Sequence, residues 1–148
     1  MRKLLTAIGS VLVAGLLVVQ LIPVERSNPP VKLEIPAPAG VSEMLQGSCY
    51  DCHSNRTQWP WYSRLAPASW FVAKHVREGR KNLNLTEWPL LDVEKQLFFL
   101  GEMKKQIKAK NMPLTSYLLV HWDARLTDDE RSELLAWIDD EILLLSSP

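Results

Sequence analysis

The chain has 148 residues, of which 47% are hydrophobic and 23% are charged, and its 17 basic residues balance its 17 acidic residues. This length accommodates one ordinary domain with an appendage and excludes a second catalytic domain. The balanced charge gives no uniform positive field, so nucleic acid is not an expected partner.

An uncharged apolar segment occupies residues 4–22, directly after Arg2 and Lys3. As an α-helix it would be roughly 28 Å long, close to the hydrocarbon thickness of a bilayer at about 30 Å. The positive residues before it favour a cytoplasmic N-terminus. Residues 1–22 are therefore predicted to anchor the chain in the cytoplasmic membrane, with the domain on the periplasmic or exterior side. A cleaved signal peptide is the alternative, although the residues after Ile22 lack the small residues that a signal peptidase prefers.

Prolines recur through residues 23–39, at Pro23, Pro29, Pro30, Pro36 and Pro38. Proline fixes the backbone and removes hydrogen-bond donors, so this segment is predicted to be an extended tether outside the core. The remaining residues, 40–148, form the predicted functional domain.

Helical patterns dominate that domain, and alternating strand patterns are scarce. Helices are expected from near Ser42 to Cys49, from Pro67 to about Asn82, over residues 92–110, and from a capping box that begins at Thr127. Residues 54–66 and 83–91 read as loops because prolines and polar turn formers break the helical period there. The fold class is therefore all-α, preceded by one membrane helix.

The run CYDCH at residues 49–53 matches the attachment signature of covalently bound c-type haem. Two thiols three positions apart can each add to one vinyl group of a single porphyrin, and the adjacent imidazole is placed to bind the iron. Cys49 and Cys52 are thus the expected attachment sites and His53 the expected proximal ligand. One covalently attached haem c per chain is the predicted cofactor.

Three other interpretations of the cysteine pair are weaker. A thioredoxin-like redox pair belongs in a βαβ context, whereas this pair follows a helix in a helical domain. A structural zinc site needs four ligands, and the additional histidines, His75 and His121, do not have ligand-pair spacing. A simple disulfide leaves the adjacent histidine unexplained.

The sixth position on the iron has four candidate ligands: Met103, Met112, His75 and His121. Met112 is favoured because a residue before proline is pushed into extended geometry, and such a loop can lay a thioether across the haem. Met103 sits on an apolar helical stripe and is expected in the core. His75 would give bis-histidine ligation or be a hydrogen-bonded histidine, and His121 is expected to be a partly exposed neighbour.

Several runs resemble the bacterial haem-binding domain family: CYDCHSNRTQWPWYSRLAPASW, then HVREGRKNLN, then MPLTSYLLVH with ARLTDDE. The resemblance covers about residues 35–145 and implies a small, membrane-anchored protein similar to monohaem c-type cytochromes of class I. By the same resemblance Cys49 and Cys52 carry the haem, His53 is the proximal ligand, and Met112 falls at the position of the distal methionine. Family members more often show glycine and glutamate before the Met-Pro pair, where this chain has Lys110 and Asn111.

The function expected from these features is one-electron transfer rather than catalysis, because no nucleophile, acid/base pair or phosphate loop is evident. A haem-based gas or redox sensor with a labile distal ligand is the alternative. The expected partner is a redox protein. Four lysines that precede Met112 could steer an acidic partner to the haem edge if they surround it: Lys104, Lys105, Lys108 and Lys110.

Overall fold

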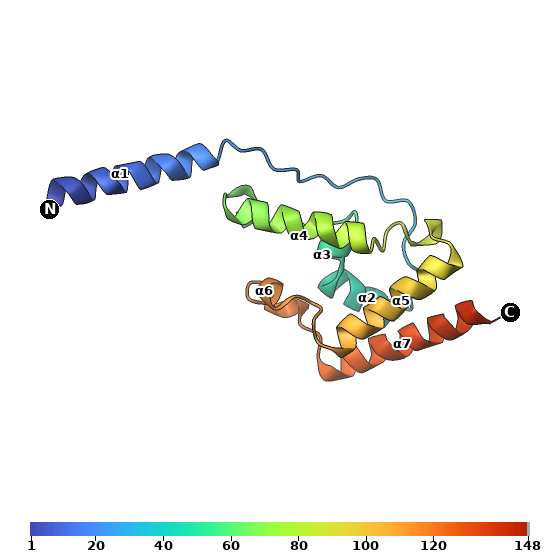
Figure 1. The fold of residues 1–148 in the computed structure, drawn as a ribbon. Helices are drawn as coiled ribbons and strands as arrows, with labels where there is room; N and C mark the ends of the chain where they lie inside the picture. Colours follow the sequence, from blue (N-terminus) through green and yellow to red (C-terminus); the bar gives the residue numbers. More distant parts are fainter. Residues whose placement is uncertain (148) are drawn as a thin grey trace.

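Helices connected by irregular segments make up the computed structural model, which describes residues 1–147 (Figure 1). No strand occurs within those residues, so the all-α prediction is confirmed. In chain order the elements are α1 (Arg2–Val19), α2 (Ala39–Ser48), α3 (Tyr50–His53), η1 (Trp61–Arg64), α4 (Ala68–Asn82), η2 (Trp88–Leu90), α5 (Val93–Lys108), α6 (Thr115–Leu118), η3 (Trp122–Ala124) and α7 (Asp128–Ser146), where η marks a 3-10 helix.

The two long helices α5 and α7 both begin at side-chain caps, and the sequence predicts the cap of α7. The Asp92 carboxylate accepts a hydrogen bond from the Lys95 backbone N–H at 2.8 Å. Thr127 and Glu130 form a reciprocal capping box at the start of α7. Each cap satisfies backbone donors that the first helical turn leaves unpaired, so both helices have well-defined starts.

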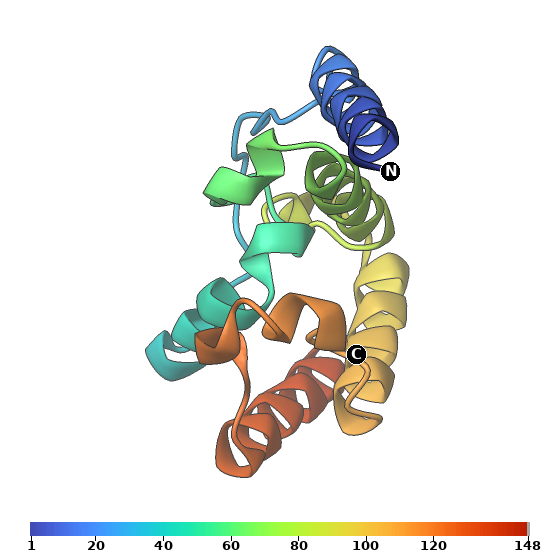
Figure 2. The same cartoon turned by 90° about the vertical axis from the view of Figure 1, so that its left-hand side faces the viewer.

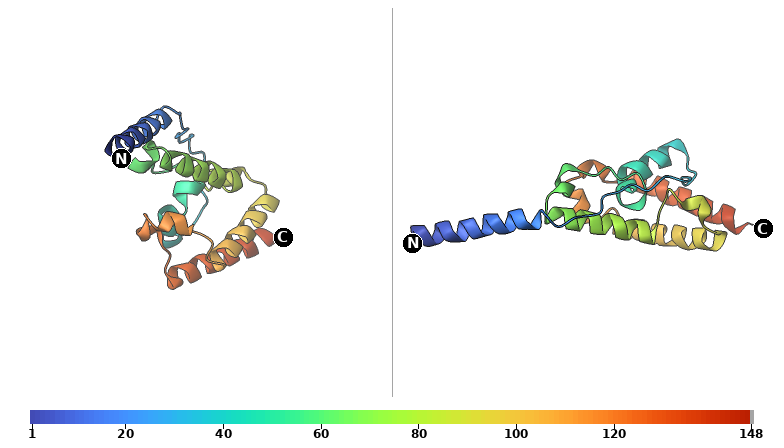
Figure 3. Two further views of the ribbon diagram at one scale, coloured as in Figure 1. Left: turned by 60° about the vertical axis from the view of Figure 1, so that its left-hand side comes forward. Right: turned by 90° about the horizontal axis from the view of Figure 1, so that it is seen from above.

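The core lies where α2, α5 and α7 meet. Leu45 from α2, Leu100 from α5, and Leu134 and Ile138 from α7 are all fully buried, at 0% exposure. Burying side chains of this size contributes about 1.5–3 kcal/mol each. This apolar centre holds α5 and α7 side by side along one flank of the molecule (Figure 3).

Residues 23–38 are extended, but they are not a spacer outside the core. We call this segment the strap. Ile35 is buried at 7% exposure, and its backbone N–H donates to the Leu85 carbonyl at 2.8 Å. Asn28 donates to the Thr57 carbonyl at 2.9 Å. The expectation of a tether outside the core is therefore wrong, because backbone and amide groups between the prolines bind the domain. The domain boundaries at residues 22 and 39 stay a prediction.

Helix α1 projects away from the other helices, and none of its residues is buried (Figures 1 and 3). With 18 residues, α1 is long and apolar enough to cross a membrane. N-terminal signal sequences share this property. Seen along α1, the domain presents η1, α4 and α6 towards that helix (Figure 2).

Candidate functional site

The CYDCH run forms the short helix α3, with Cys49 at its N-terminal boundary. The backbone N–H groups of Cys52 and His53 both donate to the Cys49 carbonyl, at 3.2 and 2.9 Å. A spacing of three residues is close to one helical turn, so the two cysteines lie on the same side of α3. The segment 54–66 that follows this turn is predicted as a loop, but it contains the 3-10 helix η1.

Both cysteines are free thiols and partly covered by protein. Burial raises the pKa of the Cys49 thiol to about 12, and the neighbouring Cys52 adds to the increase. Burial, followed by the charge of Asp51, raises the pKa of Cys52 to about 11. Reactive redox cysteines have lowered pKa values instead, so these thiols are unlike those of a thioredoxin-type pair.

The His53 imidazole is held in one orientation by the loop that follows α4. Its Nδ1 lies 3.1 Å from the Leu83 carbonyl oxygen. A carbonyl can only accept, so Nδ1 carries the proton and Nε2 keeps a free lone pair. Burial lowers the pKa of His53, which also favours the neutral ring. A neutral imidazole with a free Nε2 and a hydrogen-bonded Nδ1 is the usual form of a metal-binding histidine.

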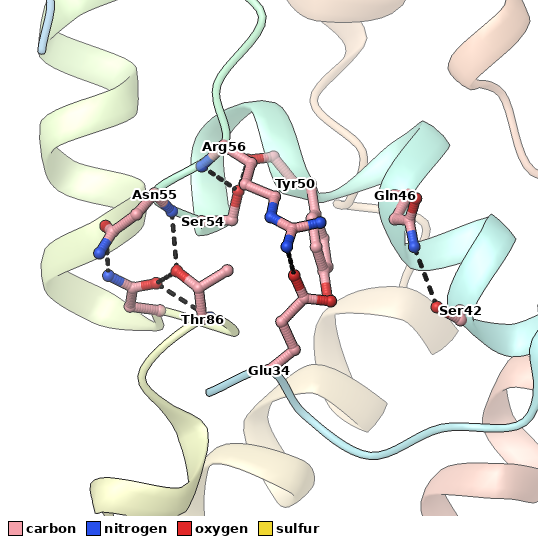
Figure 4. Close-up of polar contacts among 9 residues, drawn as sticks. Glu34, Ser42, Gln46, Tyr50, Ser54, Asn55, Arg56 and Thr86 are labelled. Atoms are coloured by element: carbon pink, nitrogen blue, oxygen red, sulfur yellow. Dashed lines mark hydrogen bonds and ion pairs between the residues drawn. The ribbon is translucent and has the colours of Figure 1, made fainter. Parts of the chain in front are cut away.

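A buried polar network fastens the same loop to the end of α3 (Figure 4). The Asn55 N–H donates to the Thr86 hydroxyl at 2.8 Å, and that hydroxyl donates to the Asn84 amide oxygen at 2.7 Å. Asn84 in turn donates to the Asn55 side chain at 2.9 Å. The Leu85 N–H also donates to the His53 carbonyl at 2.8 Å. Hydrogen bonds from the same loop therefore hold both the main chain and the ring of His53.

Gly79 lets α4 approach α3 closely. A Cβ atom at Gly79 would lie 2.3 Å from the Cys52 carbonyl oxygen and 2.9 Å from its carbonyl carbon. Both contacts are with backbone, which cannot move aside as a flexible side chain can. A side chain at this position would push α4 away from the attachment motif.

Arg80, the next residue on α4, ties the strap to the residues that follow α3. Its guanidinium donates to the Ser54 carbonyl at 2.7 Å and to the Ser27 carbonyl at 2.9 Å. It also donates to Asn28 and to the Thr57 hydroxyl, both at 2.8 Å. A planar fork with several donors suits such a junction, and the single ammonium of lysine does not reproduce it.

A cleft beside α3 brings the predicted site residues together. Two adjoining hollows, of about 580 and 280 Å³, are both lined by Cys49, His53 and Met112. Cys52 lines the smaller hollow, and Phe98, Phe99 and Leu126 line the larger one. Cofactor sites typically have volumes of about 300–1,000 Å³.

Met112 reaches this cleft because the chain reverses direction at the end of α5. The Asn111 N–H donates to the Gln106 carbonyl at 3.0 Å, and the Lys110 N–H donates to the Ile107 carbonyl at 3.1 Å. This pair of bonds is a Schellman motif with Lys110 at the left-handed position, φ 57°. Glycine would avoid the strain of that conformation.

The alternative distal ligands have other surroundings. Met103 lies in the core at 8% exposure, although it also borders the larger hollow. His75 Nδ1 lies 2.8 Å from the Phe71 carbonyl on its own helix, and the residue borders the smaller hollow. His121 Nε2 lies 2.6 Å from the Tyr62 hydroxyl and borders a third hollow of about 180 Å³, which Cys52 and His75 also line. Met112 as the distal ligand stays a prediction. It is supported by the position of Met112, which lines both hollows of the cleft.

A cluster of aromatic and polar side chains around His121 escaped the sequence analysis. The Tyr117 ring stacks on the His121 ring, with centroids 4.3 Å apart, and its hydroxyl donates to the Asp51 carboxylate at 2.9 Å. Burial raises the pKa of Tyr117, and the charge of Asp51 adds to the increase. The signal in the sequence is the spacing of four between Tyr117 and His121, which brings two side chains together across one helical turn.

The four lysines of α5 and its end do not surround the cleft: none of Lys104, Lys105, Lys108 and Lys110 lines either hollow. Lys104 pairs with Asp139, and Lys110 pairs with Asp128 at 2.9 Å. Two of the four lysines thus face acidic residues of α7, and the condition for steering a partner, that the lysines surround the haem edge, is not met at these hollows.

The residues of the cleft fit a haem. Two unpaired thiols, one imidazole with a free Nε2 and one thioether border the same hollow space, and these are the groups of a c-type centre with histidine and methionine ligands. No group of three or more His, Cys, Asp or Glu side chains suited to a metal ion occurs within residues 1–147, so the described chain offers no rival zinc cluster.

Comparison with known proteins agrees with this donor set. The family model of the haem-binding domain matches residues 14–140. The cytochrome c peroxidase Ccp of Escherichia coli (strain K12) is 29% identical over 98 residues, which cover 64% of this chain and 21% of that protein. The chain thus spans about a fifth of the length of this curated relative. No solved structure matches. Because the family model covers most of the sequence, the chain belongs to the haem-binding domain family.

Proposed function

We propose that the chain carries one covalently attached haem c and transfers single electrons on the outer side of the cytoplasmic membrane. The observation that carries this proposal is the shared cleft: Cys49, His53 and Met112 line both of its hollows, and Cys52 lines one. In this proposal each cysteine thiol adds across one vinyl group, forming a thioether without a leaving group.

The protein's own residues would then hold and shield the centre. The Leu83 carbonyl keeps the His53 Nε2 directed away from the loop and free to bind the iron. Phe98, Phe99 and Leu126 give the larger hollow an apolar wall against which a porphyrin would pack. The bound haem supplies a one-electron couple, and ligation by methionine and histidine raises its potential.

We further propose that α1 anchors the domain in the inner membrane and that the partner is another redox protein. The length and apolar character of α1 support an anchor. As a single-haem module with both axial positions filled, the chain would not itself be an enzyme. Purified protein that turned over hydrogen peroxide at an enzymatic rate would contradict this point.

A sensor with a labile distal ligand is the second candidate, and one observation favours it. Lys110, two residues before Met112, occupies a left-handed conformation that is costly for a residue with a side chain. A strained approach to Met112 would ease its release. Carbon monoxide added to the reduced protein separates the two candidates, because a closed electron carrier resists binding and a sensor binds rapidly and completely.

The distal assignment is tested by replacing Met112. Met112→Ala should abolish the near-infrared band of methionine bound to ferric haem, while the covalent haem content stays unchanged. Met103→Leu is the matched control, since it removes the other thioether near the cleft at a cost below about 1.5 kcal/mol. Persistence of the band in Met112→Ala, or its loss only in Met103→Leu, would show that Met112 is not the ligand.

A further inference from the structure

Exposed apolar side chains gather on one end of the domain. They come from η1, the start of α4, the segment after α6, and η3: Trp61 at 74% exposure, Leu65 at 50%, Trp70 at 37%, Phe71 at 53%, Leu119 at 78%, Val120 at 61% and Trp122 at 78%. We call this set the aromatic face. Apolar surface concentrated in this way on a soluble domain marks an interaction site.

The aromatic face lies at the end of the domain from which α1 emerges. Figures 1 and 3 show η1 and the start of α4 next to the C-terminal end of α1 and α6 at the same end of the domain but further from α1, whereas the end of α7 lies at the far side. Figure 2, which looks from the α1 side, shows the same three elements in front. The three views agree on this placement.

Hydrogen bonds fix the end of α1 to that part of the domain. The Gln20 side chain donates to the Ala66 carbonyl at 3.1 Å and accepts from the Ala66 N–H at 2.9 Å. Arg26 donates to the Ser63 carbonyl at 3.1 Å. Both contacts reach the segment that carries Trp61 and Leu65. The apolar stretch of the chain ends at Ile22, so Ala66 sits at the level where α1 would leave a bilayer.

The residue types of the aromatic face suit a membrane–water interface. Tryptophan is enriched at membrane–water interfaces, because its ring is apolar and its N–H can bond to polar headgroups. Arg26, which is bonded to the Ser63 carbonyl, and Arg64 are exposed in the same region of the structure and supply positive charge for lipid phosphates. A lipid surface therefore fits this face in both polarity and position.

We propose that the aromatic face inserts into the headgroup region of the membrane that α1 enters, so that the haem domain rests on the bilayer in a fixed orientation. This inference rests on the proposed anchor role of α1. The strap, which is bound along the domain rather than free, agrees with a domain that stays close to the membrane.

The test uses the full chain in phosphatidylethanolamine and phosphatidylglycerol vesicles that contain a phospholipid with a diazirine near the headgroup end of its acyl chain. After illumination, cross-linked peptides are mapped by mass spectrometry. We expect lipid adducts in α1 and also in residues 61–71 and 117–122. Adducts confined to α1 would overturn the proposal. Adducts in the aromatic face without any in α1 would overturn the anchor but support the face, so the two failures are distinguishable.

A matched pair of variants sharpens the result. Trp61→Ser combined with Trp122→Ser should lose the adducts outside α1, whereas Leu143→Ser combined with Leu144→Ser should leave them unchanged. Leu143 and Leu144 are comparably exposed, at 70% and 68%, but lie at the opposite end of the domain. Equal loss of adducts in both double variants would contradict a specific lipid face, and the haem absorption spectrum reports whether each variant is folded.

Discussion

The two sides of the cleft are built in different ways. On one side, α5 lines the cleft and is backed by α7; both helices are long, begin at side-chain caps and meet through fully buried leucines. On the other side, α3 has 4 residues and no side-chain cap, and it is held by α4, by the loop at 83–86 and by the strap. The helix that carries the chemistry is thus too short to form alone, since a single turn is unstable in isolation.

The largest effect is expected where α4 touches the motif. Gly79→Ala should destabilise the protein by about 3 kcal/mol, because its Cβ would overlap the Cys52 backbone. It should also reduce covalent haem content, since α3 is displaced. Denaturant unfolding and the pyridine spectrum measure the two effects.

Gly101→Ala provides the control for that substitution. Gly101 lies within α5, and a Cβ there meets nothing within 4 Å. Alanine should therefore stabilise α5 by about 0.5–1 kcal/mol through helix propensity, with haem content unchanged. Similar behaviour of the two alanine variants would show that close packing of α4 on α3 is unimportant.

The next largest effect concerns the junction at Arg80. Arg80→Met should cost about 2 kcal/mol, because the carbonyl of the buried Ser54 and the exposed acceptors of the strap lose a charged donor. Arg80→Lys should recover only part of this, since lysine lacks the planar fork. Full recovery by lysine would indicate that charge alone matters. Thermal unfolding with limited proteolysis of residues 23–38 provides the measurement.

A cap on the opposite side of the cleft should have a smaller and purely structural effect. Thr127→Ala removes the hydroxyl of the α7 capping box and should cost about 1 kcal/mol. The haem spectrum should not change, because α7 stands apart from the motif. A spectral change at the iron would show that the two sides are coupled more tightly than their construction suggests.

The smallest effect is expected at Lys110. Lys110→Gly relieves a left-handed residue at the end of α5 and should stabilise the protein by about 0.5–1 kcal/mol. If strain there weakens the Met112 bond, the variant should also bind carbon monoxide more slowly in the reduced state. Destabilisation by glycine would mean that the Lys110 pair with Asp128 outweighs the strain.

The sequence predicts the α5–α7 side well because its signals are local. Caps at Asp92 and Thr127 and apolar stripes appear within a few residues of where they act. The CYDCH run likewise identifies its own residues. Only the fold shows that α3 and Met112 border the same cleft. The sequence does predict that Met112, which precedes Pro113, lies outside the helix, and α5 ends at Lys108.

The support around the motif could not be predicted, because it joins residues far apart in the chain. Leu83 holds His53 through a carbonyl, which carries no side-chain signal. The sequence gives no sign that Gly79 is needed for packing, because only the fold brings Cys52 next to it. The prolines of the strap indicate extended backbone correctly, but they do not reveal that Asn28 and Ile35 bind the domain.

Covalent attachment at the cysteine pair is the central claim, and one measurement tests it most directly. Protein matured in a host that attaches c-type haem is unfolded, extracted with acidic organic solvent and analysed by intact mass. The account predicts that the pigment stays with the polypeptide and adds the mass of one haem, and that the double variant Cys49→Ala/Cys52→Ala releases it. Pigment fully extracted from the wild-type chain, or a polypeptide mass without haem, would contradict it.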